Sequence, residues 1–375
     1  MKLGLVAGAL ALGSTVAAAQ PADPAARTVA LPTGIEMRYV EAGDPDGEVV
    51  LFVHGYTDSH ISFRPTIESL LLRRPGVRAL AVDLRGHGGS SMPPAIECTA
   101  EPERCFTMAR LADDVLAFMD ALALERAHVV AHSLGSMVAQ VVALAAPQRV
   151  QSLVLIGSAA RVEGNPVIRD FVLADLIEGT WKPSLEAKGH DWPADAYELT
   201  PVDADSGAEA WLVANWVAEV AAPAAYLDEM AAMTARTPIG TWLGVARAVL
   251  EFDNVDELRE LSVPTLILWA TQDAVTAEAD QVVLRTALDE ASRVCRMTYV
   301  WKQYGRTPLS DSGTQASDLG HNFQWGAPEA VAEDIAAWLE GGAPTADHHY
   351  LDPAGPRRIA IAPGEAKLLR GEACS

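Results

Sequence analysis

The apolar residues of this chain gather in short continuous runs instead of alternating with polar ones. Strands of a parallel sheet are buried on both faces and give continuous runs of this kind. Two further strands, 28–31 and 35–40, are predicted around a Pro-Thr-Gly turn. The continuous runs occupy residues 48–53, 77–82, 127–131, 152–156, 265–269 and 294–300, the last predicted strand.

Segments with helical periodicity lie between these runs. Residues 108–124 place apolar side chains at the spacing of one helix face. Residues 134–146 and 328–339 are also predicted helices, and Pro147 ends the first of them. Strands that alternate with helices predict a parallel, doubly wound sheet, which binds ligands at the carboxyl ends of its strands.

The alternation stops between residues 157 and 256, where aromatic residues are frequent. We expect a mostly helical insertion over the ligand-binding edge of the sheet. Most of its aromatics would form its own core, and two or three that face inward would be enough to line an apolar pocket. The aromatics are Trp181, Trp192, Tyr197, Trp211, Trp216, Tyr226 and Trp242.

Composition narrows the classes of function. With 375 residues, half of them hydrophobic, the chain can bury a large core. It carries 28 Lys and Arg against 50 Asp and Glu, a formal net charge of −22. This charge argues against a nucleic-acid partner, anionic membrane surfaces and strongly anionic substrates. The sequence shows no internal repeat of 20–50 residues, which argues against a solenoid or a propeller.

The first residues have the pattern of an export signal. Lys2 precedes an uncharged apolar stretch, 3–16, and three alanines at 17–19 form a small-residue cleavage site. A membrane anchor is the alternative, but the stretch is short for a span of about 20 residues. We expect cleavage near Ala19, export to the periplasm or the medium, and no stable membrane insertion.

Four cysteines in an exported chain indicate disulfides. We expect one between Cys98 and Cys105, which flank a short acidic loop, and one between Cys295 and Cys374, which would tie the C-terminal tail to the body. Free thiols are the alternative. A metal site is disfavoured because the sequence has no Cys-x-x-Cys.

Residues 131–135, Ala-His-Ser-Leu-Gly, lie between an apolar run and a predicted helix. A Ser flanked by small residues at both second neighbours is typical of a nucleophile elbow, whose tight turn exposes the hydroxyl at a helix N-terminus. The helix end supplies a backbone N–H and a positive dipole for an oxyanion. A helix-capping Ser is the alternative reading of Ser133.

Four segments together carry a family resemblance. They are His-Gly-Tyr-Thr at 54–57, Asp-Leu-Arg-Gly-His-Gly-Gly-Ser at 83–90, the segment 131–135, and Gly-His-Asn at 320–322. In this order the chain resembles the α/β-hydrolase family over about residues 28–341. The resemblance is to the capped branch, which includes esterases, cofactor-free haloperoxidases and C–C bond hydrolases. Ala131 stands where Gly is commoner and is small enough for the turn.

The resemblance implies an α/β-hydrolase fold, with a mostly parallel sheet and a helical cap inserted between two core strands. The polar stretch 303–318 is expected to be an added loop beside the pocket mouth. The expected division is a signal peptide at 1–19, a first core part at 20–158, the cap at 159–256, a second core part at 257–341 and a tail at 342–375.

The family order of nucleophile, acid and histidine implies a triad of Ser133, Asp273 and His321. Asp273 comes four residues after the apolar run that ends at Trp269, whereas its competitors Asp253 and Asp256 precede that run. The resemblance also implies an oxyanion hole made by the backbone N–H groups of Tyr56 and Leu134. The segment 83–90 would be a supporting turn.

These residues predict an exported serine hydrolase that cleaves a carboxylic ester or lactone through an acyl-enzyme, without metal or organic cofactor. The aromatic cap favours a small to medium, apolar, uncharged substrate. A diketone C–C bond hydrolase, a haloperoxidase or perhydrolase, and a non-enzymatic ligand-binding module are alternatives. Epoxide hydrolysis and dehalogenation are disfavoured, because that chemistry in the family uses an Asp where Ser133 stands. The oligomeric state is left open.

Overall fold

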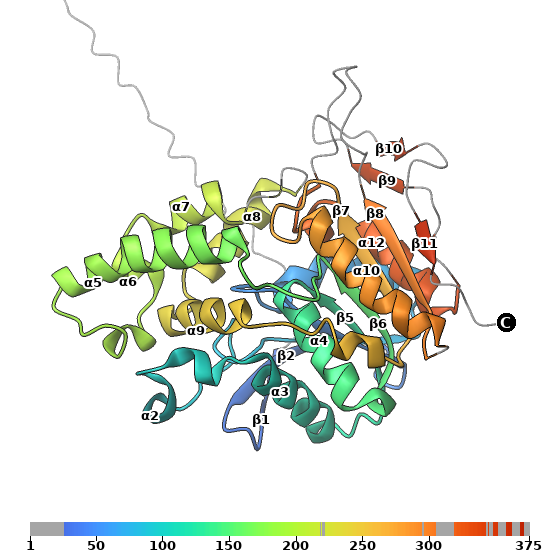
Figure 1. Ribbon diagram of the computed structural model, residues 1–375, viewed down its shortest axis with the longest axis horizontal. Coiled ribbons are helices and arrows are strands. Elements are labelled where there is room, and N and C mark those ends of the chain that lie inside the picture. Colours follow the sequence, from blue (N-terminus) through green and yellow to red (C-terminus); the bar gives the residue numbers. More distant parts are fainter. Residues whose placement is uncertain are drawn as a thin grey trace, which may run out of the picture.

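The computed structural model describes residues 26–217, 219, 222–294, 296–304, 319–342 and 344, and three short strands near the C-terminus. Its main sheet has nine strands in the order β1-β2-β4-β3-β5-β6-β7-β8-β11, and β9 and β10 form a separate pair (Figure 1). The strands are β1 (Arg27–Ala30), β2 (Glu36–Gly43), β3 (Glu48–Val53), β4 (Val77–Val82), β5 (Ala127–His132), β6 (Val150–Ile156), β7 (Thr265–Ala270), β8 (Tyr299–Tyr304), β9 (His348–Leu351), β10 (Arg358–Ile361) and β11 (Leu368–Arg370).

The six strands from β4 to β8 along the sheet are parallel, and antiparallel strands lie outside them. At one edge β1 and β2 form a hairpin, whose turn uses Gly34 at a φ of +90° that favours glycine. At the other edge β11, from the expected tail, pairs antiparallel with β8. The carboxyl ends of β3, β5, β6, β7 and β8 therefore meet at one edge of the sheet.

Alternate residues of each strand serve two cores. Leu51 and Val53 of β3 face a core shared with α3, α4 and α10, whereas Val50 and Phe52 face a core shared with α1 and α12. This burial on both faces explains the continuous apolar runs in the sequence. The helices are α1 (Arg64–Arg73), α3 (Met108–Ala121), α4 (Leu134–Ala145), α10 (Glu278–Arg293) and α12 (Pro328–Leu339).

Helices between β6 and β7 form a layer beside the sheet, on the left of Figure 1, which we call the cap. Three of its predicted aromatics, Trp181, Tyr197 and Trp242, are fully buried and contribute to its core. The cap comprises the π-helix η4 (Val167–Trp181), α5 (Lys182–Ala187), the 3-10 turn η5 (Asp195–Tyr197), α6 (Pro201–Ala204), α7 (Ala208–Asn215), α8 (Ala224–Thr234) and α9 (Ile239–Leu250). The remaining short elements are η1 (His60–Phe63), α2 (Ala95–Cys98), η2 (Pro102–Cys105), η3 (Pro147–Arg149), η6 (Glu257–Glu260) and α11 (Phe323–Gly326).

The predicted parallel sheet with an inserted helical cap is confirmed, but the last strand was placed wrongly. The sequence predicts it at 294–300, whereas α10 runs to Arg293 and β8 spans Tyr299–Tyr304. Lys302 and Gln303 look like loop residues, yet both are buried in β8. Burial of Lys302 is possible because its ammonium group lies 2.6 Å from the Asp334 carboxylate. The predicted added loop, 303–318, therefore starts two residues too early, and its other residues, 305–318, lie outside the described part of the chain.

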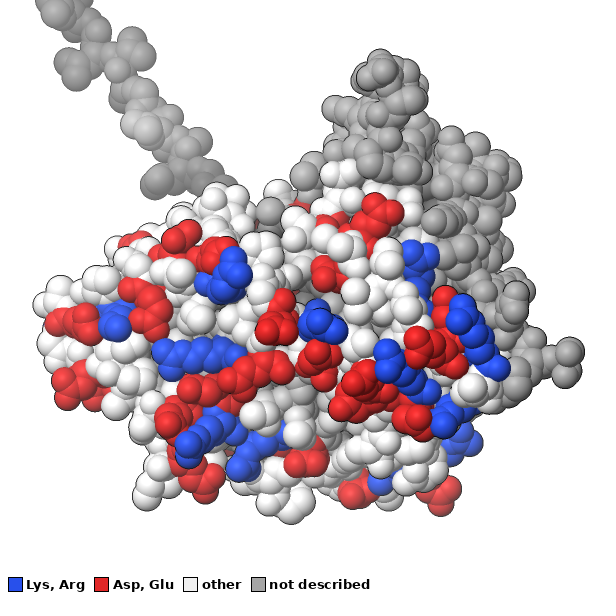
Figure 2. Space-filling model, viewed as in Figure 1, with Lys and Arg blue, Asp and Glu red and all other residues white. Residues whose placement is uncertain are grey.

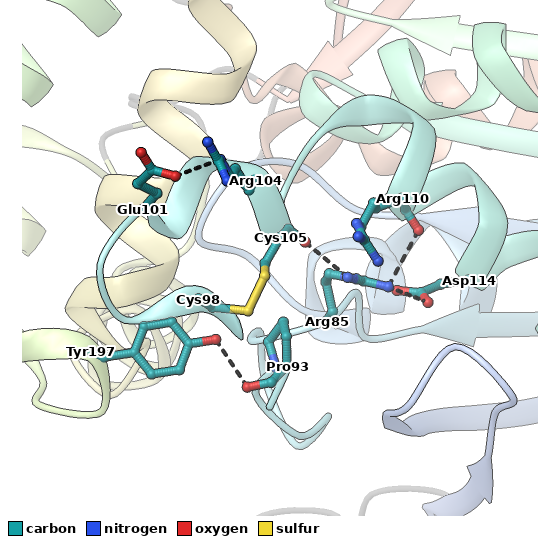
Figure 3. Close-up of a disulfide and its surroundings, with 9 residues drawn as sticks. All are labelled: Arg85, Pro93, Cys98, Glu101, Arg104, Cys105, Arg110, Asp114 and Tyr197. Atoms are coloured by element: carbon teal, nitrogen blue, oxygen red, sulfur yellow. Dashed lines mark hydrogen bonds and ion pairs between the residues drawn. A yellow bond between two sulfur atoms is a disulfide. The ribbon is translucent and has the colours of Figure 1, made fainter. Parts of the chain in front are cut away.

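A cross-linked loop joins β4 to α3 and lies against the cap (Figure 3). Its two cysteines, Cys98 and Cys105, are buried and joined as a disulfide. Arg85, at the start of this loop, donates to the Cys105 carbonyl at 2.8 Å and to both carboxylate oxygens of Asp114 on α3 at 2.6 Å. The expected signal peptide at 1–19 and the second pair, Cys295 with Cys374, lie outside the described residues.

Two surface observations bear on partners. Within the described residues, no helix is long and apolar enough to cross a bilayer. On the face shown in Figure 2, acidic and basic side chains are interspersed, so that this face carries no extended basic patch of the kind that binds nucleic acid.

The buried pair of Arg85 and Asp114 generates a stability prediction. Asp114→Ala leaves the Arg85 charge buried without its partner, and should lower the free energy of unfolding by about 3–5 kcal/mol in urea denaturation. Asp113→Ala, on the exposed face of the same helix, should change it by about 0.5 kcal/mol or less. Equal small effects of both variants would contradict this account.

Candidate active site

Ser133 lies at the sharp turn between β5 and α4. Its φ of +50° is one that non-glycine residues rarely adopt, and its backbone N–H donates to the Ile156 carbonyl at 2.9 Å. A side chain at Gly135 would place its Cβ 2.3 Å from the Val53 carbonyl oxygen, so the turn requires glycine there. Ala131, at the other second neighbour, is fully buried. The local structure therefore has the sharp strand-to-helix turn that the pentapeptide predicts, with the backbone geometry of a nucleophile elbow.

His321 lies between β8 and α11 and contacts both other predicted triad members. Its Nε2 is 2.8 Å from the Ser133 hydroxyl oxygen, and its Nδ1 is 2.9 Å from a carboxylate oxygen of Asp273. Because a carboxylate only accepts, Nδ1 carries the proton and Nε2 is free to accept from the Ser133 hydroxyl. The structure thus brings together residues that lie 188 positions apart, in the tautomer that a general base needs.

Asp273 is held in the turn after β7 by its own neighbours. One of its oxygens accepts from the backbone N–H groups of Val275 and Thr276, both at 2.8 Å. The other accepts from the Thr276 hydroxyl at 2.6 Å and from His321. Burial alone would raise the pKa of Asp273, but His321 and the Thr276 hydrogen bonds outweigh it and lower that pKa. The carboxylate is therefore both fixed and ionised.

The two competing acids lie away from this site. Asp253 forms an ion pair with Arg161, and Asp256 one with Arg259, each on the surface. Neither contacts His321 among the described contacts, so of the three candidate acids Asp273 is the one that lies against the imidazole.

The two predicted oxyanion donors border Ser133. Tyr56 follows β3 and Leu134 opens α4, and neither backbone N–H donates to a protein acceptor within the described residues. The cap fixes the Tyr56 loop: the Tyr56 hydroxyl donates to the Trp242 carbonyl at 2.5 Å, and the Trp216 indole donates to the Thr57 hydroxyl at 2.8 Å. The cap therefore helps to hold one of the two donors in place.

The segment 83–90 supports this loop from below. Asp83 accepts from the backbone and the ring of His60, at 2.7 and 2.8 Å, and from the backbone of Gly89. The Leu84 N–H donates to Nε2 of His54 at 2.9 Å, while Nδ1 of His54 donates to the Gly55 carbonyl. Burial lowers the pKa of His54, so it stays neutral and serves as a spacer between the two loops.

A cavity of about 290 Å³ opens above Ser133 and His321, between the core loops and the cap. Its walls include the aromatic rings of Phe171, Trp216 and Trp325, and Trp216 is one of the cap aromatics named from the sequence. Such a concave, mostly apolar site with a few convergent polar groups is typical of a small-molecule binding site. In the described residues, no group of three or more His, Cys, Asp or Glu side chains is arranged to hold a metal ion.

Comparison with known proteins agrees with this geometry. A family model of the alpha/beta hydrolase fold matches residues 48–298, about two thirds of the chain. The chain belongs to the α/β-hydrolase family. The match includes the elbow and the Asp273 turn, and ends before His321.

Relatives of this α/β-hydrolase are named for different hydrolytic activities. Epoxide hydrolase A of Mycobacterium tuberculosis is 38% identical over 105 residues, 28% of this chain and 30% of that protein. "Putative carbamate hydrolase RutD" of Caulobacter vibrioides is 28% identical over 297 residues, 78% of this chain and 91% of that protein. The chain thus matches less than a third of the length of several relatives.

Among solved structures, the enol-lactonase of Burkholderia xenovorans LB400 is similar with a TM-score of 0.57. The match covers 84% of this chain and all of that one, at 20% sequence identity. Similarity at this identity is similarity of fold.

This α/β-hydrolase also has site residues that sequence reasoning missed. Asp58 lies in the cavity wall, 3.7 Å from Nδ1 of His132, whose Nε2 donates to the His321 carbonyl at 3.0 Å. The cap residue Glu219 is buried and accepts from the Gly320 N–H at 3.2 Å. Neither acid lies in a motif, so only the fold reveals that they surround the His321 loop.

These acids bear on the titration of His321. Burial alone would lower its pKa, but Asp273, and after it Asp58 and Glu219, outweigh burial and raise the pKa above 6.5. A neutral imidazole is the form that accepts the Ser133 proton. The acid limb of the rate profile should therefore lie above pH 6.5.

Asp58→Asn tests this arrangement through the pH profile of kcat/KM. Removing one negative charge should shift the acid limb to lower pH, because the His321 cation loses a stabilising neighbour. Asp113→Asn, an exposed substitution on α3, should leave the profile in place. An unmoved limb in folded Asp58→Asn, or a shift to higher pH, would refute the assigned role of this carboxylate.

Proposed function

We propose that this protein is a serine hydrolase that cleaves an uncharged carboxylic ester or lactone through an acyl-enzyme. The observation that carries the proposal is the hydrogen-bonded line from Ser133 through His321 to Asp273 at the base of an apolar cavity. A nucleophile, a base and an orienting acid in this order are the parts that acyl transfer needs.

In the first half of the proposed reaction, Nε2 of His321 takes the Ser133 proton as the oxygen attacks the carbonyl carbon. The carbonyl oxygen becomes an oxyanion that accepts from the N–H groups of Leu134 and Tyr56, with the α4 N-terminal dipole behind them. The intermediate then collapses, the bond to the leaving oxygen breaks, and the His321 imidazolium protonates that oxygen. Asp273 stabilises the imidazolium throughout.

In the second half, water replaces the departed alcohol. His321 removes a proton from this water, which attacks the acyl carbon, and the proton then passes to the Ser133 oxygen as the acid leaves. The side chains of the described site supply every proton transfer, so the scheme has no step for a cofactor.

Ser133 also distinguishes this proposal from the activities in some relatives' names. The family's epoxide hydrolases use a carboxylate at the elbow, and here the elbow carries a hydroxyl beside a base. A carbamate has the same carbonyl chemistry as an ester, and is the substrate class that the name of the Caulobacter relative adds to the test panel.

We also propose that the protein is exported and oxidised. The signal-like start and the joined, buried pair of Cys98 and Cys105 support this reading. A disulfide of this kind persists in oxidising compartments. Signal-peptide cleavage near Ala19 and the second disulfide, Cys295 with Cys374, belong to the same proposal.

Ser133→Ala tests the nucleophile, and should lower kcat on p-nitrophenyl esters by on the order of 10⁴-fold or more without unfolding the protein. It should also abolish covalent labelling by a fluorophosphonate. Asp273→Asn should cost on the order of 10³–10⁴-fold, since His321 then loses its tautomer. Asp253→Asn is the matched control and should be mild. A near-normal rate in Ser133→Ala would sink the proposal.

Non-reducing peptide mapping tests the disulfides in protein from an oxidising compartment. We expect a Cys98–Cys105 peptide, a Cys295–Cys374 peptide and a mature start at Gln20. The first bond closes a small loop, so its loss in Cys98→Ser/Cys105→Ser should lower stability by roughly 2–3 kcal/mol at most. Four alkylatable thiols, or a Cys98–Cys295 peptide, would rule out the pairing.

A further inference from the structure

A second, much smaller cavity opens on the other side of Ser133. Its volume is about 20 Å³, against about 290 Å³ for the large cavity. Both cavities are lined by Tyr56, Ser133, Ile168 and Val275, so they adjoin at Ser133. His321 lines only the large cavity, and Leu134 lines only the small one.

The proton transfers of the proposed reaction assign the two sides. The leaving oxygen takes its proton from Nε2 of His321, so the leaving group must lie on the side that His321 lines. The group that stays on the Ser133 oxygen in the acyl-enzyme must then lie on the opposite side, beyond the Leu134 N–H. We propose that the small cavity is an acyl subsite for a short, uncharged chain such as acetyl or propionyl, an inference that rests on the proposed function.

The walls of the small cavity explain both its size and its preference. Met137 of α4, Val162 after β6, and Val245 and Val249 of α9 are all at most 5% exposed. A space of about 20 Å³ holds about one water-sized group. An acyl chain longer by several methylenes would therefore have to displace packed side chains.

Polar groups at this cavity are already engaged. The Asn165 amide donates to the Val275 carbonyl at 2.7 Å and accepts from the Ile168 N–H at 3.1 Å. The Thr276 hydroxyl donates to Asp273. The described lining of this cavity contains no charged side chain, so a charged acyl group would find no ion-pair partner there, and burying it would be costly. The large cavity, with Phe171, Trp216 and Trp325, suits an apolar or aromatic leaving group.

A pair of isomeric esters tests which side is which. Benzyl acetate and methyl phenylacetate have the same formula and similar alkoxide leaving groups, but exchange the bulky group between the two sides. We expect kcat/KM to favour benzyl acetate by on the order of 100-fold, because one extra or missing methylene in an apolar pocket already costs about 10–200-fold and an aromatic ring exceeds the small cavity. Preference for methyl phenylacetate, or equal rates, would overturn the assignment.

Variants of the wall test the size limit. On p-nitrophenyl esters from acetate to octanoate, wild-type kcat/KM should peak at acetate or propionate, then fall at least tenfold by hexanoate. Val249→Ala should raise the hexanoate-to-acetate ratio at least tenfold, and Val245→Ala is the second variant should the first fail to fold. Val142→Ala, equally buried in α4 but outside both cavities, should leave the ratio unchanged.

Fluorophosphonate labelling of Ser133 separates this inference from the proposed function. Labelled enzyme with a peak at hexanoate or beyond, or folded Val249→Ala and Val245→Ala with an unchanged ratio, refutes the acyl subsite alone. Absence of labelling together with absence of ester hydrolysis refutes the proposed function, and the acyl subsite with it.

Discussion

The hydrogen bond between Nδ1 of His321 and the Asp273 carboxylate is the interaction on which the proposed chemistry of this protein depends. It sets the tautomer of the imidazole, and so leaves Nε2 as the acceptor for the Ser133 hydroxyl. The bond forms because the loops after β5, β7 and β8 leave one edge of a parallel sheet. The carboxylate can stay ionised in a buried place because the Thr276 backbone and hydroxyl donate to it.

Two residues with an unfavourable backbone conformation lie near this bond, and neighbouring contacts hold both of them in place. Ser133 and Thr57 both have positive φ, at 50° and 63°. The packing of Gly135 against β3 holds the Ser133 turn. The cap holds Thr57 through hydrogen bonds from the Trp216 indole and the Thr234 hydroxyl. Both residues lie beside predicted oxyanion donors, which is where a site gains most from a backbone held in an otherwise unfavourable conformation.

The sequence was sufficient for what local pattern determines. Five of the parallel strands, the sharp turn at Ser133 and the place of Asp273 after β7 each follow from short segments in which burial or turn geometry restricts the residue type. The prediction of β8 failed because Lys302 owes its burial to Asp334, thirty-two residues away. Asp58 and Glu219 escaped for the same reason: their positions beside His321 arise from tertiary packing, and no spacing in the chain indicates them.

In the proposed reaction, acyl-chain size and oxyanion geometry are coupled through one helix. Trp242, whose carbonyl accepts from the Tyr56 hydroxyl, lies three residues before Val245 and seven before Val249, so all three share a face of α9. That face both positions the Tyr56 loop and closes the small cavity. A movement of α9 that made room for a longer acyl chain would also displace the Tyr56 N–H from the oxyanion. The helix is held against such movement by the Thr241 hydroxyl on the Gly86 carbonyl, and by packing of Gly244 on the cross-linked loop at Pro102. We therefore expect side-chain truncation at Val249 to enlarge the proposed acyl subsite without the loss of oxyanion stabilisation that a shifted helix would bring.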